Sequence, residues 1–217
     1  MKKLFIFFIA FSHIVVSQTI TGNYVVQKIG GIGGDRKLTE KSKKVDIYKY
    51  TFYDNKSKIE LINPTGTQID TIIKYNSQYD FNYETVETVI APSKSIYSKD
   101  LLNNSYERFW IINDKENYII EKLPVMNWTI SNETKILEGI LCKKATTTLT
   151  NYGYTIKYTA WYSEKVPVND GPFDYGGLPG LIFEISAENL FVCNLINFKY
   201  DEKLKTIIEP IRVSKKD

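Results

Sequence analysis

Residues 46–52 read Asp-Ile-Tyr-Lys-Tyr-Thr-Phe, and the alternation in this stretch decides the fold. Tyr48, Tyr50 and Phe52 occupy every second position, so a β-strand would place all three on one face. Residues 54–57, Asp-Asn-Lys-Ser, are typical of a turn, and a second strand is expected over 58–62. The pattern predicts an antiparallel hairpin.

The same period of two recurs through the chain. A strand is expected at 24–29, and further hairpins pair the stretches 109–112 with 118–122, 140–149 with 154–162, and 181–185 with 191–200. The chain is also rich in strand-forming residues, with 16 Tyr among its 217 residues. These features predict a mainly β protein built as an antiparallel meander.

Two short helices are expected beside the strands. Residues 98–110 begin with Ser98 as an N-cap and carry apolar residues at roughly helical spacing, and 131–138 begin with a similar capped turn. The polar stretch 76–99 is predicted to be an irregular excursion. We therefore expect a curved antiparallel sheet, or half-barrel, that closes partly around one or two short helices. By architecture alone this is similar to the half-barrel of periplasmic lipoprotein carriers.

Residues 1–17 are predicted to be a signal peptide. Lys2 and Lys3 precede an apolar run over 4–16, and Ser17 provides a small residue at a cleavage site before Gln18. The alternative of a membrane anchor is disfavoured because a spanning helix needs roughly 20 apolar residues. Residues 18–217 are then expected to be a single exported β-rich domain, periplasmic or secreted, with no membrane span after signal removal.

Charge and histidine content restrict the classes of function. The whole chain carries a formal net charge of +3, and removal of the two lysines of the signal peptide leaves 26 Lys+Arg against 25 Asp+Glu. This near-neutral balance predicts no nucleic-acid partner. His13 is the only histidine and lies in the signal peptide, so catalysis by histidine and histidine-ligated zinc are excluded from the mature chain. We expect no cofactor and no transition-metal site.

Cys142 and Cys193 are the only two cysteines. An oxidising compartment favours a disulfide between them, whereas a lone cysteine in a strand is often a small buried apolar residue. The sequence leaves both alternatives open.

Two stretches suggest chemistry but match no motif well. Gly30 to Asp35 is glycine-rich after a predicted strand, yet it fits neither common phosphate-binding pattern and is better explained as a flexible hairpin tip. The acidic residues Asp170, Asp174, Glu184 and Glu188 could supply the paired carboxyl groups of a glycosidase, although acidic residues near turns are usually solvated. No catalytic residue is assigned.

Residues 158–184 form the most informative stretch: a predicted strand, a loop rich in Pro and Gly, and a second strand. Pro179 and Gly180 fit the centre of a type II turn, in which Gly180 would adopt a positive φ. A rigid loop of this kind is either a structural corner or a shaped binding rim, and the lack of a reactive side chain within it favours the structural corner.

The hexapeptide Gly177 to Ile182, Gly-Leu-Pro-Gly-Leu-Ile, resembles the motif that names the GLPGLI family of exported bacterial proteins. The resemblance covers residues 140–185 closely and the remainder loosely. It implies an exported protein but no activity, because the family has no established catalytic residues. The positions that carry the motif are Trp161, Tyr162, Pro167, Gly171, Pro172, Gly177, Leu178, Pro179, Gly180, Leu181 and Ile182.

Two functional hypotheses follow from these features. The first is a non-catalytic envelope or secreted protein that binds an apolar or amphiphilic ligand, or an envelope protein, in the concave sheet. The second is a carboxylate-dependent hydrolase acting on an envelope or extracellular polymer, which requires two acidic groups in one cleft.

Overall fold

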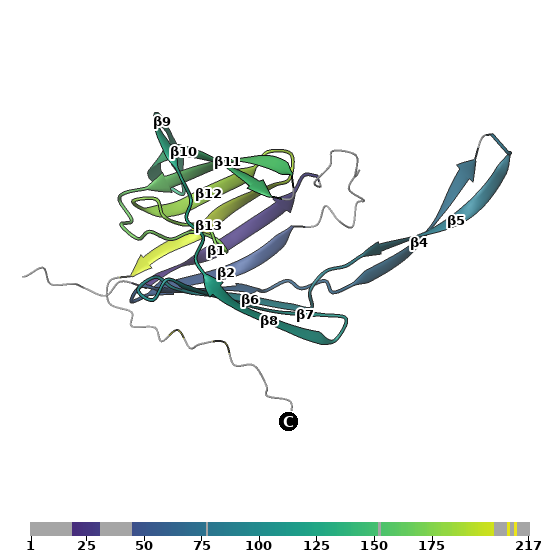
Figure 1. The fold of residues 1–217 in the computed structure, drawn as a ribbon, viewed down its shortest axis with the longest axis horizontal. Helices are drawn as coiled ribbons and strands as arrows, with labels where there is room; N and C mark the ends of the chain where they lie inside the picture. Colours follow the sequence, from purple (N-terminus) through teal and green to yellow (C-terminus); the bar gives the residue numbers. More distant parts are fainter. Residues whose placement is uncertain are drawn as a thin grey trace, which may run out of the picture.

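The protein is mainly β in the computed structural model, which describes residues 19–30, 45–76, 78–151 and 153–201 together with Ile208 and Ile211. The predicted signal peptide lies outside these residues. The described part contains thirteen strands and no helix (Figure 1). The strands are β1 (Thr19–Lys28), β2 (Asp46–Tyr53), β3 (Lys56–Leu61), β4 (Gln68–Asn76), β5 (Phe81–Val89), β6 (Lys94–Asp100), β7 (Ser105–Ile112), β8 (Lys115–Lys122), β9 (Thr129–Leu137), β10 (Ile140–Asn151), β11 (Tyr154–Ser163), β12 (Leu181–Ala187) and β13 (Phe191–Asp201).

Eleven of these strands form one antiparallel sheet in the order β8-β7-β6-β3-β2-β1-β13-β12-β11-β10-β9. The sheet does not close, because β8 and β9 stand at its two ends. The first and last strands, β1 and β13, pair near its middle. Strand β3 pairs directly with β6, and the intervening β4 and β5 form a separate hairpin that extends away from the sheet (Figure 1).

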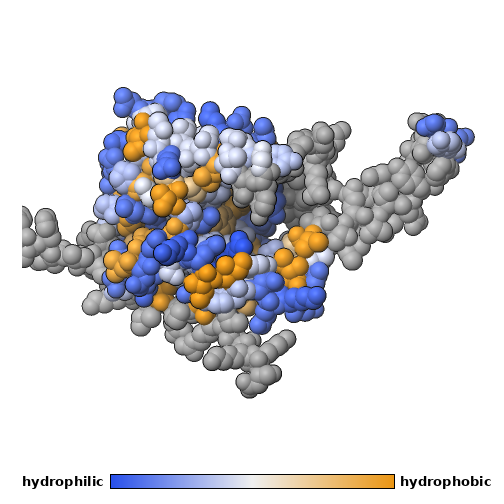
Figure 2. Space-filling model, in the orientation of Figure 1, coloured by the Kyte–Doolittle hydropathy of each residue, from blue (hydrophilic) through white to orange (hydrophobic). Residues whose placement is uncertain are grey.

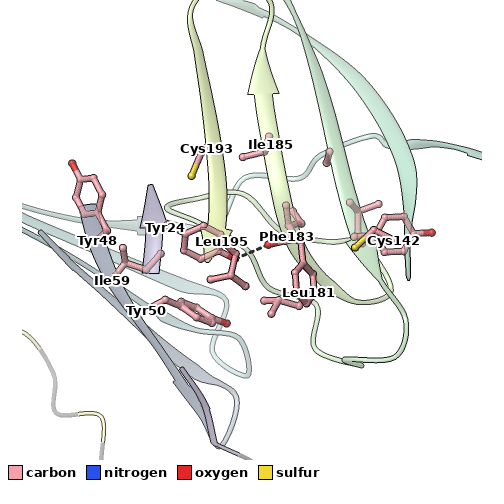
Figure 3. Close-up of a cluster of buried hydrophobic side chains, with 14 of the residues drawn as sticks. Tyr24, Tyr48, Tyr50, Ile59, Cys142, Leu181, Phe183, Ile185, Cys193 and Leu195 are labelled. Atoms are coloured by element: carbon pink, nitrogen blue, oxygen red, sulfur yellow. Dashed lines mark hydrogen bonds between the residues drawn. The ribbon is translucent and has the colours of Figure 1, made fainter. Parts of the chain in front are cut away.

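The inner face of the sheet is the face that carries the predicted alternating aromatics. Tyr48, Tyr50 and Phe52 are all buried, and Tyr50 pairs with Ile59 across the first hairpin. Tyr24 of β1 joins this core, and Figure 3 shows its ring beside side chains of β12 and β13. The meander therefore exists as predicted, with its core on the face that the period of two specified.

Both helix predictions are wrong. Residues 98–110 form the end of β6, a turn at 101–104 and most of β7, while residues 131–138 lie largely within β9. The apolar residues that suggested a helix belong to two elements: Leu101 and Leu102 lie in the turn, whereas Tyr106 and Phe109 are both buried in β7. Tertiary pairing with β3 and β8 then outweighs the weak local helix propensity.

The prediction of an irregular excursion over 76–99 is also wrong for most of that stretch. It contains β5 and most of β6, and β6 is an interior strand of the main sheet, between β3 and β7.

The two cysteines are buried free thiols. Cys142 lies on β10 and Cys193 on β13, with β11 and β12 between them (Figure 3). Adjacent strands lie about 4.8 Å apart, so three strand spacings exceed the roughly 7 Å beyond which two Cα atoms cannot be bridged. Burial raises the pKa of the Cys142 thiol to about 11, which keeps it protonated at neutral pH. Of the two alternatives left by the sequence, the structure contains the pair of thiols.

Candidate functional site

The loop of residues 164–180, which joins β11 to β12 and is called here the motif loop, lies against the inner face of the sheet. Phe173 contacts Tyr48 of β2 and Tyr97 of β6, with ring centroids 5.0 Å and 4.9 Å apart. Tyr175 contacts Tyr158 of β11 at 5.6 Å. The loop therefore fills the space where the sequence predicted one or two helices.

A buried ion pair fastens the motif loop to β6. The Asp170 side chain is fully buried and the Lys99 side chain is 2% exposed, and the Lys99 ammonium contacts Asp170 Oδ1. The same ammonium donates to the carbonyl oxygens of Gly171, at 2.6 Å, and Tyr175, at 3.2 Å. Each of the three N–H groups of the lysine thus has an oxygen neighbour, and the cation has no capacity left for another partner.

Two tyrosines complete the attachment. Tyr50 donates its hydroxyl to Asp170 Oδ2 at 2.7 Å, and Tyr24 donates to the backbone oxygen of Ile182 at 2.6 Å. Burial, followed by the nearby Asp170 charge, raises the pKa of both phenols well above their ordinary value. Both hydroxyls therefore remain neutral donors, and Asp170 is held by Lys99 on one oxygen and by Tyr50 on the other.

A cavity of about 650 Å³ opens beside this ion pair. One wall is the motif loop, from Pro167 to Gly177. The opposite wall comes from the β2–β3 turn, the β6–β7 turn and the connection between β8 and β9. Trp128 of that connection donates its indole N–H to the oxygen of Gly176 at 2.9 Å, which joins the two walls. The volume is within the range of roughly 300–1,000 Å³ that is typical of small-ligand sites.

The wall that does not belong to the motif loop is mostly apolar, although Asp54, Asn55, Lys99 and Asn104 also lie in it. It includes Phe52, Leu101, Leu102, Pro124, Val125 and Met126. Leu102 is 73% exposed and Val125 is 84% exposed, so two large apolar side chains border the cavity in contact with solvent. On the face drawn in Figure 2, apolar residues occur as separate patches among hydrophilic ones. An exposed apolar group beside a concave site is a feature of ligand-binding surfaces.

Asp174 supplies a second carboxyl group to the cavity. Burial raises its pKa, and Glu121 acts in the same direction, whereas the backbone N–H, Lys99 and Arg108 oppose the shift. Among the described residues Asp174 forms no ion pair. Its carboxylate is thus partly desolvated without a matched cation, in contrast to Asp170.

The predicted acidic cluster is only partly brought together. Asp170 and Asp174 line the same cavity, but Glu184 lies on β12 and pairs with Lys135 at 2.7 Å, and Glu188 is exposed beyond the end of that strand. Of the glycine-rich stretch, Gly31 to Asp35 lies outside the described residues. Within the described ranges no group of three or more acidic, Cys or His side chains is placed to hold a metal ion.

The motif residues divide between core and cavity. Tyr162, Leu178, Leu181 and Ile182 are buried, and Gly171 and Pro172 are buried beside them. Only Pro167 and Gly177 among the motif positions line the cavity. Trp161 lies half-buried on β11, where the Lys135 ammonium lies 4.4 Å from its ring centre. Most of the hexapeptide is therefore structural.

The predicted type II turn is wrong in one respect. Gly177 has the positive φ, +81°, whereas Gly180 does not have one. Gly180 instead donates to the oxygen of Leu178 at 2.8 Å, which forms a three-residue turn around Pro179. A Cβ at position 180 would lie 2.1 Å from the backbone oxygen of Ser163. The glycine is thus required by close backbone approach.

Sequence reasoning missed Lys99 and the apolar wall. Lys99 is at an inward position of β6, in register with Ser57 of β3 and Tyr106 of β7. A lysine at a position that alternates with inward-facing residues could have indicated a buried charge. The prediction of a helix over 98–110 prevented this interpretation. Leu102 and Val125 lie in irregular connections and carry no periodic signal.

Comparison with known proteins gives limited matches. None of the described residues forms a helix long and apolar enough to cross a membrane, and no curated protein matches the sequence. The solved structures that resemble the fold include PNGF-II in a C2 space group, with TM-score 0.54 and 15% identity over 88% of this chain, and PNGF-II in a P21 space group, with TM-score 0.51 and 14% identity over 88%. The chain spans less than a third of those chains, 28% and 29% respectively.

These structures support the mainly β, open antiparallel fold and nothing finer, because identity is low. Residues 150–184, which contain the whole motif loop, match the profile of a family described as "Protein of unknown function (Porph_ging)". In this segment the chain is therefore similar to a family that has no assigned activity.

Proposed function

We propose that the protein is an exported, non-catalytic binding protein that takes a small amphiphilic ligand in the cavity beside the motif loop. The observation that carries this proposal is the pairing of a solvent-exposed apolar wall, with Leu102 and Val125 at 73% and 84% exposure, with a polar end at Asp174. Burial of such side chains by a ligand would contribute roughly 25 cal/mol per Å² of apolar surface removed from water.

The sequence predicts a ligand site on the concave aromatic face of the sheet. The cavity is a smaller site than that whole face. The chain's own motif loop packs on Tyr48, Tyr97 and Tyr158 of that face. The space beside residues 167–177 of the loop remains open as the cavity. Export, to the periplasm or beyond, is proposed from the predicted signal peptide, and membership of the GLPGLI family from residues 177–182. Recovery of Gln18 as the first residue of exported protein would support the export.

The alternative of a carboxylate-dependent hydrolase is less well supported. Acid–base catalysis needs two carboxyl groups that can exchange protons with a substrate. Asp170 is engaged by Lys99 and Tyr50 on its two oxygens, which leaves Asp174 as the one carboxyl of the two that has no side-chain partner among the described residues. Binding without chemistry is therefore the better proposal.

The test uses a neutral amphiphile of matched size, decan-1-ol, titrated calorimetrically against the folded protein. We expect saturable binding that is weakened at least fivefold by Leu102→Glu or Val125→Glu, because a charge on the apolar wall must be desolvated. Ile136→Glu is the matched control: Ile136 is 71% exposed on β9 and does not line the cavity. Equal binding by all three variants, or no binding by the parent protein, would overturn the proposal.

A further inference from the structure

The charges around the cavity are not balanced. Among the described residues, its lining contains the acidic and basic side chains of Asp54, Lys99, Asp170 and Asp174. Lys99 and Asp170 form a buried pair and cancel each other. The two remaining charges are both carboxylates, Asp54 in the exposed β2–β3 turn and Asp174 in the motif loop.

No cation in the described lining is left to compensate them, and Arg108, which acts on Asp174 from outside that lining, forms no ion pair with it. Among the described lining residues Lys99 is the only basic side chain, and its ammonium is already engaged by Asp170 and by the oxygens of Gly171 and Tyr175. The other polar side chains of the described lining are neutral: Asn55, Asn104 and Asn169 carry amides, and burial raises the pKa of the Tyr175 phenol. An anionic ligand would therefore meet two like charges and no available positive partner.

We infer that the ligand of this cavity is a cationic amphiphile, with its apolar body on the wall of Leu101, Leu102 and Val125 and its amine or ammonium head beside Asp174. This inference rests on the proposed binding function and adds the charge of the ligand. Asp174 is the specificity-determining residue, because it is half-buried in the motif loop and forms no ion pair within the described part of the chain. Asp54 is exposed and acts more weakly, because water screens its charge.

The position of Asp174 fits this role. Burial raises the pKa of its carboxyl group, so the protein holds this carboxylate at a site that disfavours the ionised form. Functional sites commonly contain groups held in such unfavourable surroundings. An ammonium head would give the Asp174 carboxylate an ion-pair partner. It would not need to displace any of the contacts that Lys99 makes.

The experiment compares three ligands with the same ten-carbon tail: decyltrimethylammonium, decan-1-ol and decanoate. Each is titrated into the full-length mature protein at pH 7.5 and low ionic strength, below its micelle concentration. We expect the cation to bind about fivefold tighter than the alcohol, and the anion to bind more weakly than the alcohol. Asp174→Asn should reduce the preference for the cation over the alcohol to less than twofold and leave alcohol binding unchanged.

Two matched variants complete the design. Asp54→Asn removes the exposed carboxylate of the same lining and should change the preference for the cation less than Asp174→Asn does. Glu188→Gln removes an exposed carboxylate that does not line the cavity and should have no effect. Each variant is accepted only if its melting curve shows a single cooperative transition.

Failure of this inference can be distinguished from failure of the binding proposal. If decan-1-ol does not bind, the binding function itself is wrong. If the alcohol binds but decanoate binds as tightly as decyltrimethylammonium, the site exists and its inferred charge preference is wrong. A preference for the cation that survives Asp174→Asn would also overturn the role given to Asp174.

Discussion

Two glycines of the hexapeptide have different physical roles. Gly177 has φ of +81° and open space where a Cβ would lie, whereas Gly180 has ordinary φ and a backbone oxygen 2.1 Å from that position. A side chain at 177 meets only backbone strain, and a side chain at 180 must displace the end of β11. The second is the larger perturbation, because main chain cannot give way as a flexible side chain can.

We therefore expect Gly180→Ala to lower the free energy of unfolding by about 2–3 kcal/mol and Gly177→Ala by about 1 kcal/mol. Gly177→Asn should be milder than Gly177→Ala, because Asn tolerates positive φ. Gly180→Asn should be at least as damaging as Gly180→Ala. Urea denaturation of the four variants measures these differences. A Gly180→Ala protein as stable as the parent would contradict the close backbone approach.

The buried pair of Lys99 and Asp170 is a second feature at the residue scale. Removal of one partner leaves the other as an uncompensated charge in the core, so Lys99→Met and Asp170→Leu should each lower the free energy of unfolding by about 3–5 kcal/mol. The double variant should lose clearly less than the sum of the two. Tyr50→Phe, which removes one hydrogen bond from Asp170, should lose about 1–2 kcal/mol.

A double-mutant cycle analysed from chemical denaturation tests the coupling. An additive double variant would show that the two side chains do not stabilise the fold as a pair.

At the scale of elements, the β4–β5 hairpin is separable from the sheet. Strand β3 is in register with β6, with Glu60 opposite Ile96, so the sheet is continuous without the hairpin. Replacement of residues 68–89 by a Gly-Ser-Gly linker should change the free energy of unfolding by less than about 1 kcal/mol, because the linker only closes a loop. Thermal melting with a matched decan-1-ol titration checks both folding and the cavity. Loss of the cooperative transition would mean that the hairpin supports the sheet.

The elements also show what the sequence could predict. The alternation in 46–52 and 154–162 gave correct strands and, at Tyr48 and Tyr158, correct buried faces, because a period of two is local information. Strand β9 was missed because its burial pattern is largely exposed, so it has no apolar alternation to detect. Strand β6 was missed because its inward positions include Ser95 and Lys99.

The candidate site was harder to predict than the fold. The motif loop was recognised from Pro and Gly, yet its burial depends on partners at Tyr24, Tyr50 and Lys99, which are 70 or more residues away in sequence. Asp170 and Asp174 were both named as acidic candidates. Asp170 is paired and Asp174 is not, because Tyr50 of β2 and Lys99 of β6 both contact Asp170. These contacts join strands that are far apart in the sequence, so the local sequence around residues 170–174 could not predict them.

At the scale of the whole molecule, the ionisation of Asp174 is expected to affect both the stability of the fold and the binding of the ligand. The groups that act on its carboxyl are Lys99, Arg108 and Glu121, with Tyr106 and Tyr175 also close in electrostatic terms. Burial raises the pKa of Asp174 in the folded state above its unfolded value of about 3.9. Below pH of about 3.9 both states are protonated, so the residue contributes no penalty. As the pH rises through the folded-state pKa, the unfolded chain releases the proton more readily and the folded state loses stability.

Asp174→Asn should therefore raise the melting temperature at pH 7.5, and this gain should vanish as the pH falls below about 4.

Decyltrimethylammonium should raise the melting temperature of the parent protein at pH 7.5, because a ligand that binds only the folded state stabilises it. The shift should shrink with acidification, since protonation removes the charge that holds the head group. In Asp174→Asn the ligand-induced shift should be small and nearly independent of pH. Glu121→Gln, which removes the other nearby carboxyl group, should retain the pH dependence of the parent. Melting curves of the three proteins are recorded at pH 4, 5, 6 and 7.5, with and without the ligand. An Asp174→Asn protein that is less stable than the parent at pH 7.5 would contradict this prediction. It would show that contacts within the folded protein already stabilise the Asp174 carboxylate without a ligand.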